Sequence, residues 1–256
     1  MWSNHKVRLR EMTFLEHFEE LRSRLVKSFV GVAVGFGLCY AFIDPIMKML
    51  EAPYMKWLPT GQKTLAYTQV TEVFFVYMKA AAVAGLVVSS PWVFYQLWAF
   101  IVPGLKPREK KWGFPFVLLT SLFFIGGVVF CYYIVLPFTF RFFFSFNEGF
   151  TNVVTVTYFW SFELKFLLGI GLTFETPMIL LLLTRLGLVG TGFLLRQYKW
   201  AILLAFIVAA VITPSGDPVT QSIVAVPIVI LYGIGIAISW IFRKRETATS
   251  EERNQQ

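Results

Sequence analysis

The sequence predicts an all-α integral membrane protein that crosses the bilayer six times and forms a single membrane domain, residues 1–256. Hydrophobic residues make up 57% of the chain and charged residues only 15%, a composition far from that of a soluble domain. Several apolar runs reach about 20 residues, the length that a helix needs to cross a hydrocarbon core of about 30 Å. The predicted spans are residues 25–43, 74–93, 114–136, 166–184, 200–212 and 223–242.

The positive charges predict the topology of these spans. Most of the 23 Lys and Arg residues lie in four segments: 1–27, 106–111, 185–199 and 243–256. Six crossings place all four in the cytoplasm, as the positive-inside rule requires. The run at 200–212 reaches only about 20 Å at about 1.5 Å per residue, but without it the basic tail would lie opposite the basic N-terminus. We therefore expect both termini to be cytoplasmic and the fifth span to be short.

The N-terminal cytoplasmic segment, within residues 1–24, contains the start of a predicted amphipathic helix that runs into the first span. Thr13 and Glu16 have the spacing of a capping box. Glu16 and Glu20 lie one helical turn apart, a like-charge pair that costs a few tenths of a kcal/mol unless a cation offsets it. Arg24 is placed to do so at the i+4 position from Glu20. The apolar side of this helix follows helical spacing, with Phe14, Phe18, Leu21 and Leu25.

A second membrane-surface segment covers residues 91–112. Its aromatic and apolar residues again follow helical spacing, and Pro103 with Gly104 predicts where that helix ends. Glu109 follows as a single acid among four basic residues. Taken alone, Glu109 either offsets repulsion among its neighbours or binds a cation. Both Glu20 and Glu109 thus lie on surface segments that are otherwise rich in positive charge.

The fourth span contains an acid, Glu175. A carboxylate at the centre of a membrane helix costs about 2.5–3.5 kcal/mol on insertion scales, so it is tolerated mainly where it faces protein, water or a ligand path. Pro177 removes a helical hydrogen bond next to it, which predicts a polar cluster of Thr173, Glu175 and Thr176 inside the membrane. Two interpretations stay open: a protonated acid bonded to a neighbouring helix, or a functional group.

Several classes of function are not supported. Cys39 and Cys131 fall inside spans, away from the two histidines, His5 and His17, so we expect no metal site. The sequence contains no nucleotide-binding loop and no hydrolase motif, so we expect no cofactor and no enzymatic activity. An intramembrane hydrolase would also need a nucleophile and a base at membrane depth. Nucleic acid is not expected as a partner, because the basic residues flank apolar segments and form no contiguous patch.

Four stretches of this sequence resemble the TatC family, the multispanning receptor subunit of the twin-arginine protein translocase. The resemblance covers about residues 12–242 and implies six helices, cytoplasmic termini and a short hairpin of the fifth and sixth helices. The Phe-rich external segment 137–158 matches no family motif. The stretches are FLEHFEELRSRL before the first span, SPWVFYQLWAFIVPGL together with the following Glu109 in the first cytoplasmic loop, LTFETPMILLL in the fourth span, and ITPSGDPVTQ between the fifth and sixth spans.

The resemblance also implies roles for individual residues. Glu20 and Glu109 would bind the paired arginines of a signal peptide, because a carboxylate grips a planar guanidinium with two hydrogen bonds and a lysine lacks that geometry. Glu175, with Thr173 and Thr176, would meet a polar residue of a partner helix. Four further residues fall on family positions: Arg22 and Phe100 at the signal-peptide surface, and Pro53 and Asp217 on the external side. Gln221 belongs to the same short hairpin as Asp217.

The predicted function is therefore to bind twin-arginine signal peptides of folded proteins and to nucleate a translocation complex. The expected partners are single-span TatA-like and TatB-like subunits, membrane lipid and further copies of the chain, with transport driven by the proton-motive force. A bacterial cytoplasmic membrane is favoured, because no Ser- and Arg-rich transit peptide precedes Met12. The alternative is a small proton-coupled secondary transporter using Glu175. Such a protein should carry broken helices in paired halves, and the sequence shows no internal repeat.

Overall fold

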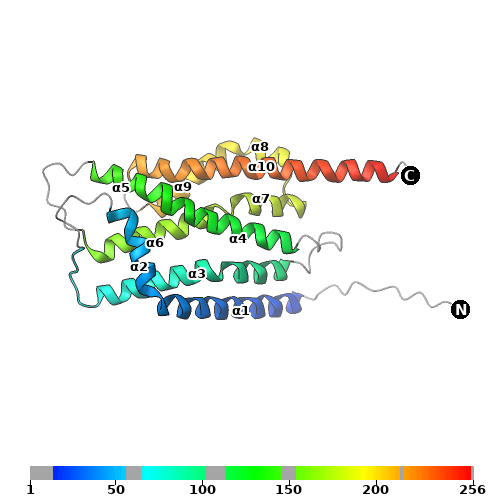
Figure 1. Cartoon of the computed structure of the whole chain (residues 1–256). Coiled ribbons are helices and arrows are strands. Elements are labelled where there is room, and N and C mark those ends of the chain that lie inside the picture. The colour runs from blue at the N-terminus through cyan, green and yellow to red at the C-terminus, as the bar shows by residue number, and fades with distance from the viewer. Residues whose placement is uncertain (1–13, 56–64, 102–112, 146–153, 214–215, 255–256) are drawn as a thin grey trace.

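The computed structural model describes residues 14–55, 65–101, 113–145, 154–213 and 216–254, and within these segments the side chains are described from residue 15 to residue 241. These residues form a helical bundle, which confirms the predicted all-α fold (Figure 1). In chain order its helices are α1 (Phe14–Ala41), α2 (Ile43–Met55), α3 (Glu72–Ile101), α4 (Gly113–Phe130), the π-helical turn η3 (Cys131–Val135), α5 (Leu136–Phe144), α6 (Val156–Thr173), α7 (Thr176–Arg185), α8 (Thr191–Arg196), α9 (Tyr198–Ile212) and α10 (Pro218–Asn254).

Six helical segments of the described chain are apolar enough to be spans. Five are long enough to cross a bilayer by themselves, and α9 is the shorter sixth. The start of α1 and the end of α10 lie at the same end of the bundle (Figure 1), as six crossings require. The distribution of positive charge assigns this end to the cytoplasm. We call it the cytoplasmic end and the opposite one the external end.

Several helices extend beyond the predicted spans. The third span continues through η3 and α5, so the apolar helical segment covers Gly113–Phe144. The fourth begins at Val156, ahead of the predicted residue 166. The sixth helix is longer than predicted: its apolar part alone covers 24 residues, against the 15 of α9, and α10 continues into the predicted tail. Charged residues interrupt an apolar run, but they do not interrupt the backbone hydrogen bonds that continue a helix.

The membrane-surface segments are continuous with the spans. The helix α1 joins the predicted amphipathic segment to the first span without a break, and α3 runs from the second span through Pro91 to Ile101. Pro91 has no N–H for the carbonyl one turn earlier. The hydroxyl of Ser90 donates to that carbonyl, of Val87, at 2.7 Å, and so keeps it hydrogen-bonded.

Two glycines bring α1 and α3 into backbone contact. A Cβ atom built on Gly35 would lie 2.6 Å from the carbonyl oxygen of Gly85, and one built on Gly85 would lie 2.5 Å from the backbone nitrogen of Phe36. Any larger residue at either position would force the helices apart. Nearer the cytoplasmic end, the indole N–H of Trp92 donates to the carbonyl of Lys27 at 3.0 Å. These contacts hold α1 against α3, and the one at Lys27 lies about two helical turns from Glu20.

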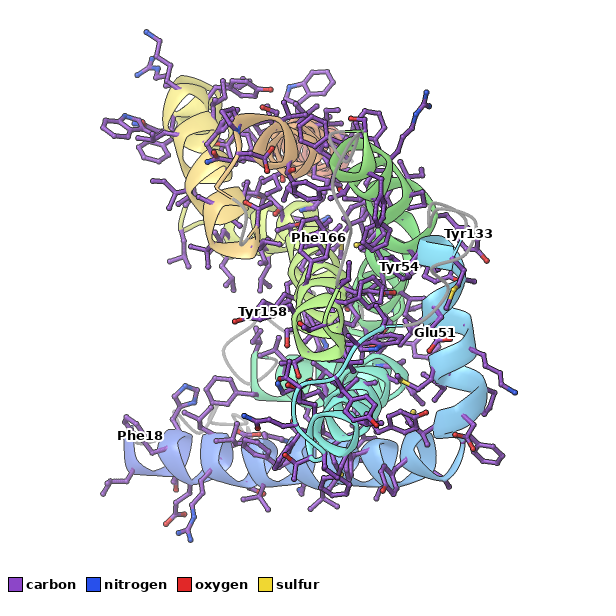
Figure 2. All side chains as sticks on the ribbon, turned by 90° about the vertical axis from the view of Figure 1, so that its left-hand side faces the viewer. Phe18, Glu51, Tyr54, Tyr133, Tyr158 and Phe166 are labelled. Carbon is purple, nitrogen blue, oxygen red and sulfur yellow. The ribbon has the colours of Figure 1, made fainter. Side chains whose placement is uncertain are left out.

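The helix α2 covers part of the external end. Its buried residues include Pro53 and Tyr54. The Tyr54 ring lies 4.2 Å from that of Phe159 in α6 and 5.8 Å from that of Phe140 in α5, measured between centroids, and Figure 2 shows it directed from α2 toward the bundle. The sequence did not predict this helix. Asp44, Lys48 and two prolines make the segment resemble a loop, and its buried face appears only when the spans supply a surface to cover.

Candidate functional site

Glu20 lies on the cytoplasmic part of α1, next to the end of α3. Its Oε1 accepts from Arg24 Nη2 at 3.4 Å, and Arg24 Nη1 donates to Gln96 Oε1 of α3 at 3.2 Å. The i+4 pairing of Glu20 with Arg24 expected from the sequence is therefore present. The second carboxylate oxygen, Oε2, is buried and has no hydrogen-bond partner within the described residues. Oε1 of Glu20 therefore has a donor within the protein, whereas Oε2 lacks a donor among the described residues.

Aromatic stacking positions the neighbouring residues. His17, one turn before Glu20, stacks on Phe100 near the end of α3, with ring centroids 4.5 Å apart. Phe100 therefore lies at the same α1–α3 contact as Glu20. Arg22 is exposed, and its position two residues after Glu20 places it on the opposite side of the helix. Glu109 lies outside the described residues, as do Pro103 and Gly104.

The predicted break in the fourth span is present. The helix α6 ends at Thr173, and α7 begins at Thr176, with Glu175 at the position just before it. The Thr176 hydroxyl donates to the carbonyl of Thr173 at 2.6 Å, which is the carbonyl that Pro177 leaves without its helical partner. The Thr173 hydroxyl donates to Ile170 at 2.8 Å. The threonines therefore satisfy the broken backbone, and their hydroxyl protons are not directed to Glu175.

Glu175 itself is 6% exposed, and its Oε1 is buried without a hydrogen-bond partner in the described part of the chain. Only the 10 residues of α7 separate it from the cytoplasmic end of the span, so it lies nearer to that end than the middle position predicted from residues 166–184. Its place at the start of α7 suits an acid, because backbone N–H groups point toward the start of a helix.

The hairpin of α9 and α10 is held by polar contacts at the external end. Gln221 Nε2 donates to the carbonyl of Phe206 in α9 at 2.8 Å, and Asp217 Oδ1 accepts from the backbone N–H of Thr220 at 2.7 Å, which caps α10. Pro53 is buried in α2. These three residues have contacts that stabilise the fold, and they lie far along the bundle from Glu20.

No group of three or more His, Cys, Asp or Glu residues in the described segments could hold a metal ion. The residues described at the predicted sites are acids, hydroxyls and aromatic rings. This set is suited to binding a cationic peptide and to helix contacts.

The comparisons with known proteins all lead to one family. The profile described as Sec-independent protein translocase protein (TatC) matches residues 16–227. The chain belongs to the TatC family. The TatC protein of Koribacter versatilis is 37% identical over 252 residues, covering 95% of this chain and 93% of that protein. The TatC protein of Desulforapulum autotrophicum is 40% identical over 240 residues, covering 93% and 88%.

A plant relative and a solved structure agree with this assignment. The chloroplastic TATC of Pisum sativum is 35% identical over 226 residues, which are 87% of this chain and 62% of that protein. A crystal structure named as the twin-arginine translocase receptor TatC has a TM-score of 0.79 at 33% identity, covering 88% of this chain and 99% of the other. The chain is therefore a multi-pass membrane protein of a protein translocase, not an enzyme, and a secondary transporter is not favoured.

The sequence did not predict a second buried acid of this TatC-family chain. Glu163 in α6 is 0% exposed, and both of its carboxylate oxygens lack a hydrogen-bond partner among the described residues. Cys131 of η3 and Glu51 of α2 interact with it electrostatically. Glu163 and Lys165 interrupt the apolar run, so the hydropathy pattern places this segment before the predicted fourth span. A helical extension of that run toward residue 156 would have placed an acid inside the membrane.

Proposed function

We propose that this protein is the receptor that binds twin-arginine signal peptides for its translocase. The observation that carries this proposal is Glu20: Arg24 and Gln96 fix one side of the carboxylate, and its Oε2 has no partner among the described residues. A signal-peptide arginine would supply the missing donor. The family relationship supports the same role, since the structurally similar protein is named as the twin-arginine translocase receptor.

The arrangement around Glu20 favours arginine over lysine. A guanidinium donates two parallel N–H bonds to a carboxylate, whereas an ammonium group acts as a point charge. Arg24 already supplies one guanidinium to Oε1, and an incoming guanidinium would bridge to Oε2. Glu109 is proposed to bind the second arginine, and it follows α3 by eight residues in the sequence. Phe100, stacked on His17, would border the same surface. Arg22 is exposed on the opposite side of α1, so its role at the signal peptide is proposed from its family position alone.

The partners proposed for assembly are single-span TatA-like and TatB-like subunits and further copies of this chain. Glu175 supports a helix contact inside the membrane, because its buried Oε1 has no donor in the described segments and a polar side chain on a partner helix would supply one. We place the protein in a bacterial cytoplasmic membrane and expect the proton-motive force to drive transport. Pro53, Asp217 and Gln221 are proposed to keep the external end and the α9–α10 hairpin in the shape that such partners meet.

The decisive experiment measures the binding of a fluorescent signal peptide to the purified protein. Glu20→Gln and Glu109→Gln should each raise the dissociation constant by about tenfold, because charge-assisted hydrogen bonds are roughly twice as strong as neutral ones and each exchange removes about 1–1.5 kcal/mol. The double variant should lose about a hundredfold. A twin-Lys peptide should bind the native protein more weakly than the twin-Arg peptide.

Glu19→Gln is the matched control. Glu19 is exposed on the same helix, so this variant removes the same charge next to the site while leaving Glu20 in place. It should bind nearly as well as the native protein. Unchanged twin-Arg binding by the double variant, or an equal loss in the Glu19 variant, would contradict the assignment of Glu20 and Glu109 as arginine-binding residues.

A further inference from the structure

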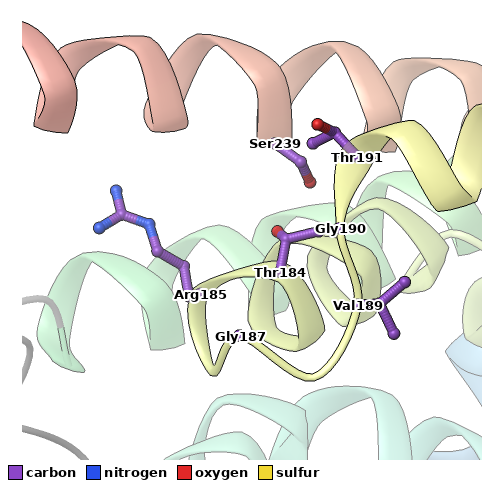
Figure 3. Close-up of a pocket in the computed structure, with 7 residues that line it drawn as sticks. All are labelled: Thr184, Arg185, Gly187, Val189, Gly190, Thr191 and Ser239. Atoms are coloured by element: carbon purple, nitrogen blue, oxygen red, sulfur yellow. The ribbon is translucent and has the colours of Figure 1, made fainter.

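A polar cavity lies at the cytoplasmic end, between the end of α7, the following turn and α10 (Figure 3). Its volume is about 400 Å³, and Thr184, Arg185, Thr191 and Ser239 contribute its polar side chains. Gly187 adopts a φ of 71° in the turn, a conformation that glycine reaches without strain. A Cβ atom added at Gly187 or Gly190 would meet no atom within 4 Å, so the turn leaves open space here.

Ser239 is the residue that indicates a ligand. It is 3% exposed, and its Oγ is buried without a hydrogen-bond partner in the described structure. Figure 3 shows this hydroxyl directed from α10 toward the cavity. A buried hydroxyl without a partner is costly, so its donor suits a ligand oxygen. The Thr184 hydroxyl donates to the carbonyls of Leu180 and Leu181, which leaves its lone pairs to accept a hydrogen bond.

An apolar groove of about 400 Å³ adjoins this cavity. Thr191 lines both. The groove continues along α8 and α10 toward the membrane interior, between Leu195, Ile236 and Trp240. Gly233 lies on its α10 side, and a Cβ atom there would meet no atom within 4 Å. A polar cavity therefore opens next to an apolar groove of similar volume.

We propose that the cavity and groove together bind an anionic glycerophospholipid. The phosphate would lie between the Ser239 hydroxyl and the Arg185 guanidinium, a headgroup hydroxyl would donate to Thr184, and one acyl chain would follow the groove past Gly233. The position suits this ligand, because α10 continues into the basic residues 243–245 at the end that faces the cytoplasm, and basic pockets between spans at this level hold lipid phosphates. An inorganic phosphate would use only the cavity, and a partner helix only the groove.

Native mass spectrometry of the detergent-purified protein tests this proposal. With added phosphatidylglycerol, the native protein should retain one lipid molecule more strongly than with phosphatidylcholine, and inorganic phosphate at the same concentration should not displace it. Gly233→Leu fills the groove and should lower lipid retention at least fivefold, and Ser239→Ala should lower it by a smaller factor. Both variants should fold, because Gly233 faces open space and Ser239→Ala removes only an unpartnered oxygen.

Gly126→Leu is the matched control, since a Cβ at Gly126 of α4 would also meet no atom within 4 Å. It adds the same apolar bulk at another open helix position, and lipid retention should not change. Equal retention by the native protein and the Gly233 variant would overturn the proposal. Full displacement by inorganic phosphate would also overturn it and indicate an anion site without a lipid chain. Displacement of the lipid by a single-span partner helix would reassign the groove to that partner.

Discussion

Glu163 and Glu175 are two acids of the same spanning segment, yet their surroundings differ. Glu163 is completely enclosed in the external half of the spanning segment Val156–Arg185. Glu175 lies at a helix break near the cytoplasmic end, where the backbone is already irregular and 6% of the residue is exposed. A partner protein can contact Glu163 only if the core opens. Glu175 can bind a side chain of a partner helix at the surface of the bundle.

This difference predicts opposite consequences for the two acids. Removing Glu175 should impair function and leave the fold intact, whereas removing Glu163 should leave function intact and alter stability. The π-helical η3 next to Glu163 widens the helix by one residue per turn, a feature that often marks functional positions. A loss of transport on replacing Glu163 would therefore assign it a role in the translocase, whereas a change in stability alone would make it a structural residue.

The largest effect is expected for Glu175→Ala. A polar contact between membrane helices is worth about 1–2 kcal/mol, so its loss should weaken partner assembly by about five- to thirtyfold. Insertion should be unchanged or improved, because the substitution removes a carboxyl from the membrane. Transport of a folded reporter into membrane vesicles and co-purification of the partner subunits measure both effects. Normal transport with an unchanged partner complex would contradict the proposed contact.

The second effect is expected for Glu163→Met, which keeps a side chain of similar length without a carboxyl. A buried polar group with no hydrogen bond costs about 1–3 kcal/mol by mutational data, so the variant should be more stable by about that amount. Its melting temperature in detergent should rise, and transport should be preserved. Ala209→Ser is a useful converse, since it adds a hydroxyl to a fully buried position of α9 and should lower the melting temperature. A transport defect in Glu163→Met would show that this acid acts in the translocase.

The sequence was sufficient for the number of spans and for Glu175, and each has a physical reason. A span must be apolar over its whole length, so the hydropathy pattern records it directly. Glu175 stood out because the nine residues on either side of it, 166–174 and 176–184, include no other charged residue. Glu20 and Arg24 were also predicted as a pair, because their i+4 spacing fixes their separation on any helix.

The features that the sequence did not predict depend on tertiary packing. The helix α2 is amphipathic over only 13 residues and contains Pro53, so its position depends on the aromatic surface that Phe140 and Phe159 offer to Tyr54. Glu163 was missed because its burial depends on the packing of α6 against α3 and α4, which are distant in the sequence. The contact of Arg24 with Gln96 spans 72 residues, and helical spacing carries no information about such a pair.

The smallest effect is expected at the helix break between α6 and α7, which contains Glu175. Thr176→Val removes the hydroxyl that donates to the Thr173 carbonyl, and Pro177 has no N–H to replace it. The lost hydrogen bond is worth about 0.5–1.5 kcal/mol, and the melting temperature in detergent should fall accordingly.

Thr120→Val is the matched control, because the Thr120 hydroxyl also donates to carbonyls of its own helix, those of Phe116 and Val117. Both of these carbonyls keep their helical N–H donors. The control should lose less stability than Thr176→Val. Equal losses would show that the break does not depend on this hydroxyl, and the position of Glu175 would then have to be explained by the packing of Phe174 against Gly127.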